Sequence, residues 1–212
     1  MVVLCISRQF GAGGRTLAER LAQRLGYAYS DEELVSRLVA RTGIDREMVE
    51  TAGREATGKS KGFISGLLST GFLLRLLGQA SVESPEEKLA SLLHEIIPEM
   101  AARGNIVFLG RGSQFILPTA PDIIKVFLTA QEEDRVRFMM EKYDLDLEQA
   151  QKAVHEFKKN RDDFLSRFTA DPNDVSIYSL CINTSLVSLE KAEDLICRLV
   201  EIRQGQKDPR AD

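Results

Sequence analysis

The chain has 212 residues, of which 43% are hydrophobic and 28% charged, a composition typical of a globular protein with a sizeable core. The net charge of −4 argues against binding of a nucleic acid polymer through a broadly basic surface. The 3 cysteines lack paired spacing, which argues against a disulfide framework or a zinc site. Cys5 and Cys181 lie in apolar runs and are predicted to be buried thiols in strands. Because no segment resembles a signal peptide or an uninterrupted membrane span, we expect a cytoplasmic protein that does not bind membranes.

The first predicted strand and helix flank a glycine-rich loop. Val2–Ile6 is a continuous apolar run, as expected for a strand buried on both faces. After the loop, Leu17, Leu21 and Leu25 recur on one face of a predicted helix that ends at Gly26. In a strand–loop–helix unit of this kind, backbone N–H groups and the helix N-terminus can bind phosphate.

The loop departs from the common phosphate-binding motif G-x-x-x-x-G-K-S/T. When its core at 11–13 is aligned on that motif, Gly14 falls on the lysine position and Arg8 replaces the first glycine. Arg15 can supply the missing cation, because its planar fork holds two phosphate oxygens, and Thr16 offers a hydroxyl group to phosphate or Mg²⁺. The alternative is a tight glycine turn with Arg15 on the surface. The predicted phosphate-binding residues are Gly11, Ala12, Gly13, Gly14, Arg15 and Thr16.

A second stretch, GREATGKS at residues 53–60, fits the motif at every specified position. It lacks the required setting, because Ile44, Met48, Val49 and Ala52 precede it at helical spacing and no strand is predicted there. We interpret GREATGKS as a connection between helices and not as a phosphate site.

Further strands are predicted near Tyr27–Tyr29 and at Ile106–Leu109, Ile123–Leu128 and Ile177–Ile182, with helical patterns between them. This alternation predicts an α/β fold with a mostly parallel sheet. About 75 residues, roughly 31–105, separate the second and third strands, far more than a usual crossover connection has.

Two parts of this insertion have distinct patterns. Residues 61–79 are apolar with scattered Gly and Ser, and we interpret them as core or dimer packing. The alternative is a flap over a substrate or a surface that binds a partner. Further on, Ser84 and Pro85 predict the cap and the first residue of a helix.

Arginines follow the third and fourth strands. Arg111 stands between two glycines at the end of a strand, where open α/β sheets bind ligands, and is predicted to bind an anionic group. The alternative is a turn with an exposed Arg111. After the fourth strand, two charged helices form a predicted hairpin in which Arg135 and Arg137 lie on different faces, with Arg161 and Arg167 further on. Such a hairpin either neutralises a transferring phosphoryl group or is only a solvated charged pair of helices.

Taken in order, these stretches resemble the cytidylate kinase-like family of P-loop nucleoside monophosphate kinases. The similarity lies in ISRQFGAGGRTLAERLAQRLGY, YAYSDEELV, VFLGRGSQFIL, VFLTAQEEDRVRFM, NRDDF and INTS, and it spans nearly the whole chain. It implies one domain over residues 1–212 with a P-loop NTPase three-layer α/β fold and a five-stranded parallel sheet. It also implies a helical NMP-binding insertion at about 31–105 and a lid at about 131–168. The implied cofactors are ATP and Mg²⁺, and the implied reaction is phosphoryl transfer to CMP or dCMP.

The resemblance also assigns roles to individual residues. It implies that the six loop residues bind the phosphates of ATP, with Thr16 close to Mg²⁺. It implies that Asp31, Arg111 and Arg167 bind the substrate, and that Arg15, Arg135 and Arg161 are the cations of catalysis.

Two positions depart from the family pattern. Lys158 stands where the family often has Asp, three residues before Arg161, and Ser179 stands where the last strand often has Asp. These replacements keep open a nucleotide-binding regulatory protein with little or no turnover. The long insertion keeps open a kinase for a non-nucleotide small molecule. The expected partners are nucleotide substrates, and residues 61–79 offer a surface for a homodimer.

Overall fold

The computed structural model describes residues 1–42 and 85–205. GREATGKS at 53–60, the apolar segment 61–79 and the predicted cap Ser84 lie outside the described residues.

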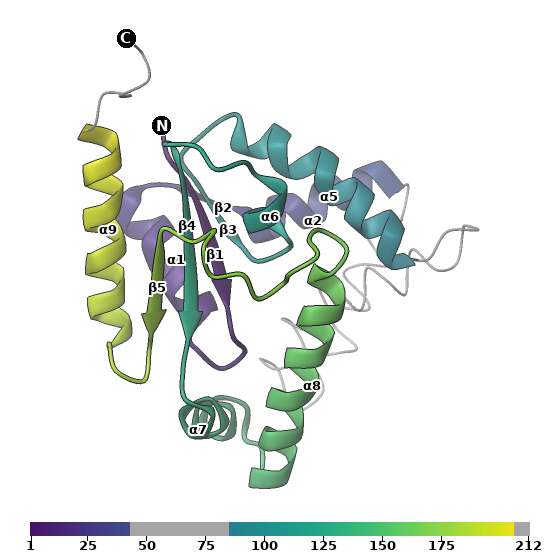
Figure 1. Cartoon of the computed structure of the whole chain (residues 1–212), viewed down its shortest axis with the longest axis vertical. Helices are drawn as coiled ribbons and strands as arrows, with labels where there is room; N and C mark the ends of the chain where they lie inside the picture. The colour runs from purple at the N-terminus through teal and green to yellow at the C-terminus, as the bar shows by residue number, and fades with distance from the viewer. Residues whose placement is uncertain (43–84, 206–212) are drawn as a thin grey trace.

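In the described part of the chain, five strands form one parallel sheet in the order β2-β3-β1-β4-β5 (Figure 1). Their bounds are β1 Val3–Arg8, β2 Ala28–Tyr29, β3 Ile106–Leu109, β4 Ile123–Thr129 and β5 Leu180–Asn183. The predicted α/β class, the parallel sheet and the presence of each strand are confirmed.

The prediction was wrong about where the last strand begins. It starts at Leu180, three residues after the predicted Ile177. The residues before it form a turn in which the Tyr178 N–H donates to the Val175 carbonyl at 3.2 Å. The chain joins the sheet only where the Ser179 N–H donates to the Lys125 carbonyl at 2.7 Å.

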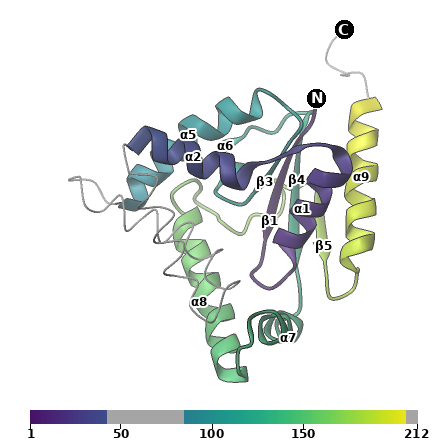
Figure 2. The same cartoon turned by 180° about the vertical axis from the view of Figure 1, so that it is seen from behind.

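Helices cover both faces of the sheet, as a buried parallel sheet requires (Figures 1 and 2). The helices α1 (Gly14–Leu25) and α9 (Leu189–Gly205) pack on one face, where they meet Leu4 and Ile6 of β1. The helices α2 (Ser30–Thr42), α5 (Pro85–Ala101) and the short α6 (Ser113–Ile116) build the opposite core. Because successive strand residues point to opposite faces, Val3 and Cys5 belong to that second core.

The two predicted strand cysteines differ. Cys5 is fully buried, and its burial raises the pKa of the thiol to about 12. The prediction that Cys181 is buried was wrong, since it is exposed. It lies on the edge strand β5, where the neighbouring Ile182 points into the core with α9. The helices of the other face pack mainly on β1 and β3, so they leave Cys181 uncovered.

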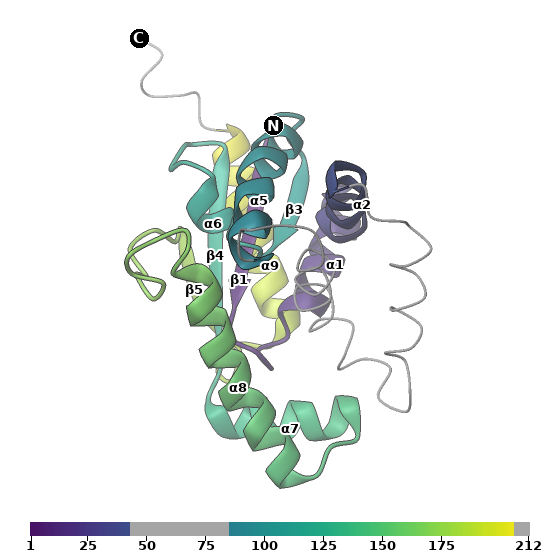
Figure 3. The same cartoon turned by 90° about the vertical axis from the view of Figure 1, so that its right-hand side faces the viewer.

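A pair of helices lies beyond the carboxyl ends of the strands (Figures 1 and 3). These are α7 (Glu132–Tyr143) and α8 (Leu147–Leu165), which share a small core of Val136, Met139, Ala150 and Val154. A capping box at Asp146 begins α8. None of the described helices is both long and apolar enough to cross a membrane.

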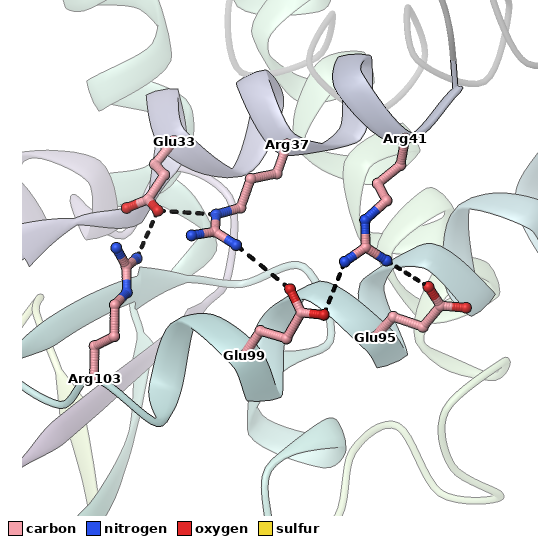
Figure 4. A network of polar contacts seen from close by, with 6 residues as sticks. All are labelled: Glu33, Arg37, Arg41, Glu95, Glu99 and Arg103. Atoms are coloured by element: carbon pink, nitrogen blue, oxygen red, sulfur yellow. Dashed lines mark hydrogen bonds and ion pairs between the residues drawn. The ribbon is translucent and has the colours of Figure 1, made fainter.

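Charged side chains join α2 to α5 (Figure 4). Arg41 donates to Glu95 and Glu99 at 2.8 Å each, and Arg37 and Arg103 both bond to Glu33, at 2.9 and 2.6 Å. Arg37 also donates to Glu99 at 3.4 Å. Each exposed pair contributes only about 0.2–1 kcal/mol. Together they fix α2 against α5, and α2 carries Asp31 in its first turn.

Candidate functional site

A cavity of about 620 Å³ opens at the carboxyl ends of β1, β3 and β4, where parallel α/β sheets bind ligands. The glycine loop, the start of α2, and the helices α7 and α8 surround it. Of the residues predicted from sequence, Gly11, Gly13, Gly14, Arg15, Thr16, Asp31, Arg111, Arg135, Arg161 and Arg167 line this cavity. Ala12 does not line it, because its side chain is buried in the core under α1.

The loop glycines are required by close packing as well as by backbone conformation. Gly11 and Gly13 have φ angles of 86° and 76°, in the left-handed region that disfavours side chains. A Cβ atom on Gly11 would lie 2.8 Å from Cβ of Arg135, and one on Gly13 would lie 2.8 Å from a methyl group of Leu189. Since α1 begins at Gly14, the positive end of its helix dipole lies at the cavity. The loop therefore has the form of an anion-binding turn.

Arg15 and Asp31, predicted to act on different substrates, contact each other. Nη2 of Arg15 donates to Oδ2 of Asp31 at 3.0 Å, and the Tyr29 hydroxyl group donates to the same oxygen at 3.1 Å. Burial lowers the pKa of Arg15, but Asp31, Tyr29 and Glu19 outweigh it and raise the pKa above its usual value. The Arg15 side chain is 41% exposed, so it lies at the surface of the cavity and is paired there with Asp31.

Arg111 is buried at the end of β3. Its backbone has a φ of 60°, rare for a residue with a side chain, and its side chain is only 8% exposed. Nη2 lies 3.9 Å from Oδ1 of Asp31. Burial lowers the pKa of Arg111, and Asp31 partly offsets this effect. The alternative of an exposed Arg111 in a turn is therefore wrong, and the strained backbone holds the side chain in the cavity.

The arginines of α7 and α8 reach the cavity from the other side. Arg135 is buried, and its Nε has no hydrogen-bond partner among the described residues. Arg137 is 66% exposed, which confirms that the two arginines lie on different faces of α7. Arg161 donates from Nη2 to the Ser7 hydroxyl group at 3.4 Å, and its guanidinium lies 5.5 Å from the centre of the Phe127 ring. Arg161 therefore connects α8 to the end of β1.

Contacts also join the tip of the loop to α8. The rings of Phe10 and Phe157 stack with their centres 3.5 Å apart and an angle of 8° between their planes. Next to Phe157, Nζ of Lys158 pairs with Asp162 at 3.1 Å, and Asp162 also accepts from Arg161 at 3.0 Å. The lysine that replaces an expected Asp therefore lies at the cavity and neutralises a neighbouring carboxylate.

Oxygen donors suited to Mg²⁺ line the cavity. They are the hydroxyl group of Thr16 and the carboxylates of Asp31, Asp162 and Asp163, and hard oxygen ligands are the type that Mg²⁺ prefers. Within residues 1–42 and 85–205, no three His, Cys, Asp or Glu side chains form a preformed metal site. A Mg²⁺ ion here would therefore take some of its ligands from a bound phosphate.

Several cavity residues were not given a site role from the sequence, and four of them are charged or polar residues of interest here. Asp162 and Asp163 belong to the charged hairpin, and only their position at the cavity distinguishes them. Gln114 is 1% exposed, and neither polar atom of its amide has a partner among the described residues. In the sequence, the only feature that points to Gln114 is that it is a polar residue close to the GRG turn. Arg8 lines the cavity from the last position of β1, and the sequence had marked it only as the residue that replaces the first glycine of the common motif.

Comparisons with known proteins identify the family of the chain. The model of the cytidylate kinase-like family matches residues 3–186, and the chain belongs to that family. A cytidylate kinase of Staphylothermus marinus is 27% identical over 207 residues, covering 95% of this chain and 97% of that protein. A cytidylate kinase of Chlamydia felis is also 27% identical and covers 94% of this chain and 98% of its own.

Solved structures share the fold. A crystal structure of an uncharacterized protein from Eubacterium ventriosum covers 95% of this chain and 99% of its own, with a TM-score of 0.67 and 18% identity. A gluconokinase from Sinorhizobium meliloti covers 96% of this chain and 94% of its own, with a TM-score of 0.51 and 11% identity. At these identities, the likeness shows the α/β fold alone.

Proposed function

We propose that the chain is an ATP-dependent nucleoside monophosphate kinase that transfers a phosphoryl group to CMP or dCMP. Membership of the cytidylate kinase-like family supports a phosphotransferase, and the cytidylate kinases among its relatives support this acceptor. The observation that carries the proposal is the composition of the cavity. A glycine loop meets Asp31 and Arg111 on one side and Arg135 and Arg161 on the other.

In this proposal the loop and the first turn of α1 bind the phosphates of ATP through backbone N–H groups. Thr16 presents its hydroxyl group to Mg²⁺, which neutralises phosphate charge when bound. Arg135 and Arg161 stabilise the charge that develops on the transferring phosphoryl group, and Arg167 contributes a further cation at the end of α8. The mechanism needs no general base from the protein, because phosphoryl transfer rests mainly on positioning and electrostatics.

The acceptor would lie against Asp31 and Arg111. Arg111 is largely desolvated, so its attraction for an anion is strong, and Asp31 prevents the site from being uniformly positive. Gln114 supports an acceptor with a base, because its buried amide still has one donor group and one acceptor oxygen unsatisfied. A cytosine edge offers both complementary groups.

Arg15 connects the two halves of the site. Its side chain leaves the donor loop but contacts Asp31 on the acceptor side. From this position the guanidinium can bridge the two phosphates between which the phosphoryl group moves. We therefore expect Arg15→Ala to weaken ATP binding by about 1–3 kcal/mol, the scale of a lost hydrogen bond to a charged group.

The test is ATP consumption with Mg²⁺ against CMP, dCMP, UMP, AMP, GMP and no acceptor. Lys59→Ala, in GREATGKS, is the matched control for Arg15→Ala, because each removes one cation from a motif-like stretch. We expect turnover that depends on CMP or dCMP and on Arg15, with Lys59→Ala like the wild type. Calorimetric titration with ATP checks binding directly. Equal loss of ATP affinity in both variants would refute the assignment of the N-terminal loop.

The regulatory alternative draws on one observation, the pairing of Lys158 with Asp162 at the cavity. This pair reduces the negative charge available to Mg²⁺. ATP binding without turnover on any acceptor in the panel would favour that function. ATP consumption with a non-nucleotide small molecule, and with no nucleotide of the panel, would favour a kinase for a non-nucleotide acceptor.

A further inference from the structure

The side chain of Arg8 packs closely against two glycines, Gly14 and Gly110. Its stem lies against Gly14, where an added Cβ atom would be 2.8 Å from Cγ of Arg8. Its guanidinium lies against Gly110, at the end of β3, where an added Cβ atom would overlap Nη1. Gly110 also has a φ of 67°. The loop after β1 and the turn after β3 therefore both leave room for this one side chain.

The guanidinium of Arg8 has no ion-pair partner in the described part of the chain. No carboxylate among residues 1–42 and 85–205 lies within 4.0 Å of it. The nearby Asp31 bonds to Arg15 and Tyr29 instead. Burial, reinforced by the positive charge of Arg111, lowers the pKa of Arg8 to about 10, while Asp31 acts in the opposite direction. A desolvated guanidinium that stays charged without a countercharge is energetically costly, so a bound anion would stabilise it.

The position of Arg8 indicates which substrate would supply that anion. The side chain leaves β1 on the side of β3, toward Gly110 and Arg111, whereas the donor loop turns toward Arg135 on α7. Arg161 approaches the same region, because it bonds to Ser7, directly before Arg8. The guanidinium groups of Arg8 and Arg111 therefore lie on the acceptor side of the cavity, and Arg161 of α8 reaches toward them from the opposite side through its bond to Ser7.

We propose that Arg8 binds the phosphate group of the acceptor, so that the site selects acceptors that already carry a phosphomonoester over neutral hydroxyl acceptors. The proposal rests on the function proposed above and deepens it, because it gives a role to the residue that replaces the first glycine of the common motif. A phosphomonoester carries close to two negative charges at neutral pH, which suits several converging guanidinium groups better than a neutral sugar does.

The experiment uses the full chain with a saturating non-hydrolysable ATP analogue, which fills the donor loop. CMP, cytidine and inorganic phosphate are then titrated calorimetrically into the wild type, Arg8→Gln and Arg8→Lys. Arg137→Gln is the matched control, because it removes an exposed arginine from α7. Urea unfolding of each variant verifies that it is folded. Gly110→Ala is a further variant that keeps Arg8 but displaces its guanidinium.

We expect Arg8→Gln to weaken the affinity for CMP and for inorganic phosphate by about tenfold to a hundredfold, the equivalent of one hydrogen bond to a charged group. In Arg8→Gln, the affinity for the ATP analogue should change less than about threefold. Arg8→Lys should recover part of the lost CMP affinity, because it keeps the positive charge. Gly110→Ala should also weaken the affinity for CMP. The preference of the wild type for CMP over cytidine should shrink in Arg8→Gln.

Other outcomes separate the two proposals. If the wild type binds inorganic phosphate in an Arg8-dependent way but does not bind CMP, the role of Arg8 stands and CMP is not the acceptor. If CMP binds equally to the wild type and to Arg8→Gln, the role of Arg8 is refuted while the kinase proposal stands. A loss in Arg8→Gln that falls mainly on the ATP analogue would place Arg8 with the donor and overturn the inference.

Discussion

Replacing Asp31 by Asn tests the centre of the acceptor side, because the change removes one charge and almost no volume. Oδ2 accepts hydrogen bonds from Arg15 at 3.0 Å and from Tyr29 at 3.1 Å, and Oδ1 lies 3.9 Å from Arg111. The Asn side chain can keep one of these hydrogen bonds but cannot balance the two guanidinium groups.

The magnitude follows from exposure. A hydrogen bond to a charged group contributes about 1.5–3 kcal/mol when buried, and an exposed ion pair about 0.2–1 kcal/mol. The Asp31 side chain is 17% exposed and that of Arg15 is 41% exposed, so this pair falls near the lower end, at about 1 kcal/mol. Arg111, at 8% exposure, loses its nearby countercharge and brings the total to about 1–2 kcal/mol. For a chain of this size, that corresponds to a fall in Tm of about 2–8 °C.

Urea unfolding followed by circular dichroism measures this loss, and a thermal scan gives the change in Tm. Glu19→Gln is the matched control, because Glu19 lies 4.0 Å from the same Arg15 but is 52% exposed, and it should cost less than about 0.5 kcal/mol. In activity assays, Asp31→Asn should raise KM for CMP by about tenfold and leave KM for ATP nearly unchanged. A variant as stable as Glu19→Gln, with an unchanged KM for CMP, would show that the reasoning about Asp31 is wrong.

Two further predictions concern the loop and the α2–α5 contact. Gly11→Ala should lower the free energy of unfolding in urea by more than about 2 kcal/mol and abolish ATP binding measured by calorimetry. Gly26 has a similar positive φ but open space around it, so Gly26→Ala should lower that free energy by only about 1 kcal/mol and keep ATP binding. Equal costs would mean that the close packing of the loop is unimportant. The hydrogen bond from Arg103 lowers the pKa of Glu33 below its usual 4.5, so its stabilisation is present above that pH and is lost as the pH falls through the lowered value. Glu33→Gln should flatten the dependence of unfolding free energy on pH between about pH 5 and 3, and slopes equal to the wild type would contradict this.

Much of the fold could be predicted because its signals are local. Strands buried on both faces of a parallel sheet appear as continuous apolar runs, as β1 and β3 do. The start of the last strand was missed because Ile177 and Tyr178 are apolar, while their backbone forms a turn that no pattern of hydrophobicity records. Cys181 was misjudged for a related reason, since only the strand order shows that β5 is an edge.

The candidate site divides in the same way. The glycine loop was predictable from the sequence, because the strand, the loop and the helix of this proposed phosphate site are contiguous in the chain. The sequence also predicted Arg111, since a strand end followed by Gly-Arg-Gly is a local signal. Which of these residues contact one another depends on the tertiary structure. Arg15 bonds to Asp31 because α1 and α2 both begin at the same edge of the sheet.

Only the pairing of β1 with β3 places Arg8 beside Gly110, more than a hundred residues away in the chain. The electrostatic environment of a side chain depends on groups that are near it in space and not in sequence. The desolvation of the Arg8 guanidinium and its lack of a countercharge therefore become visible only when the strands that surround it are in place.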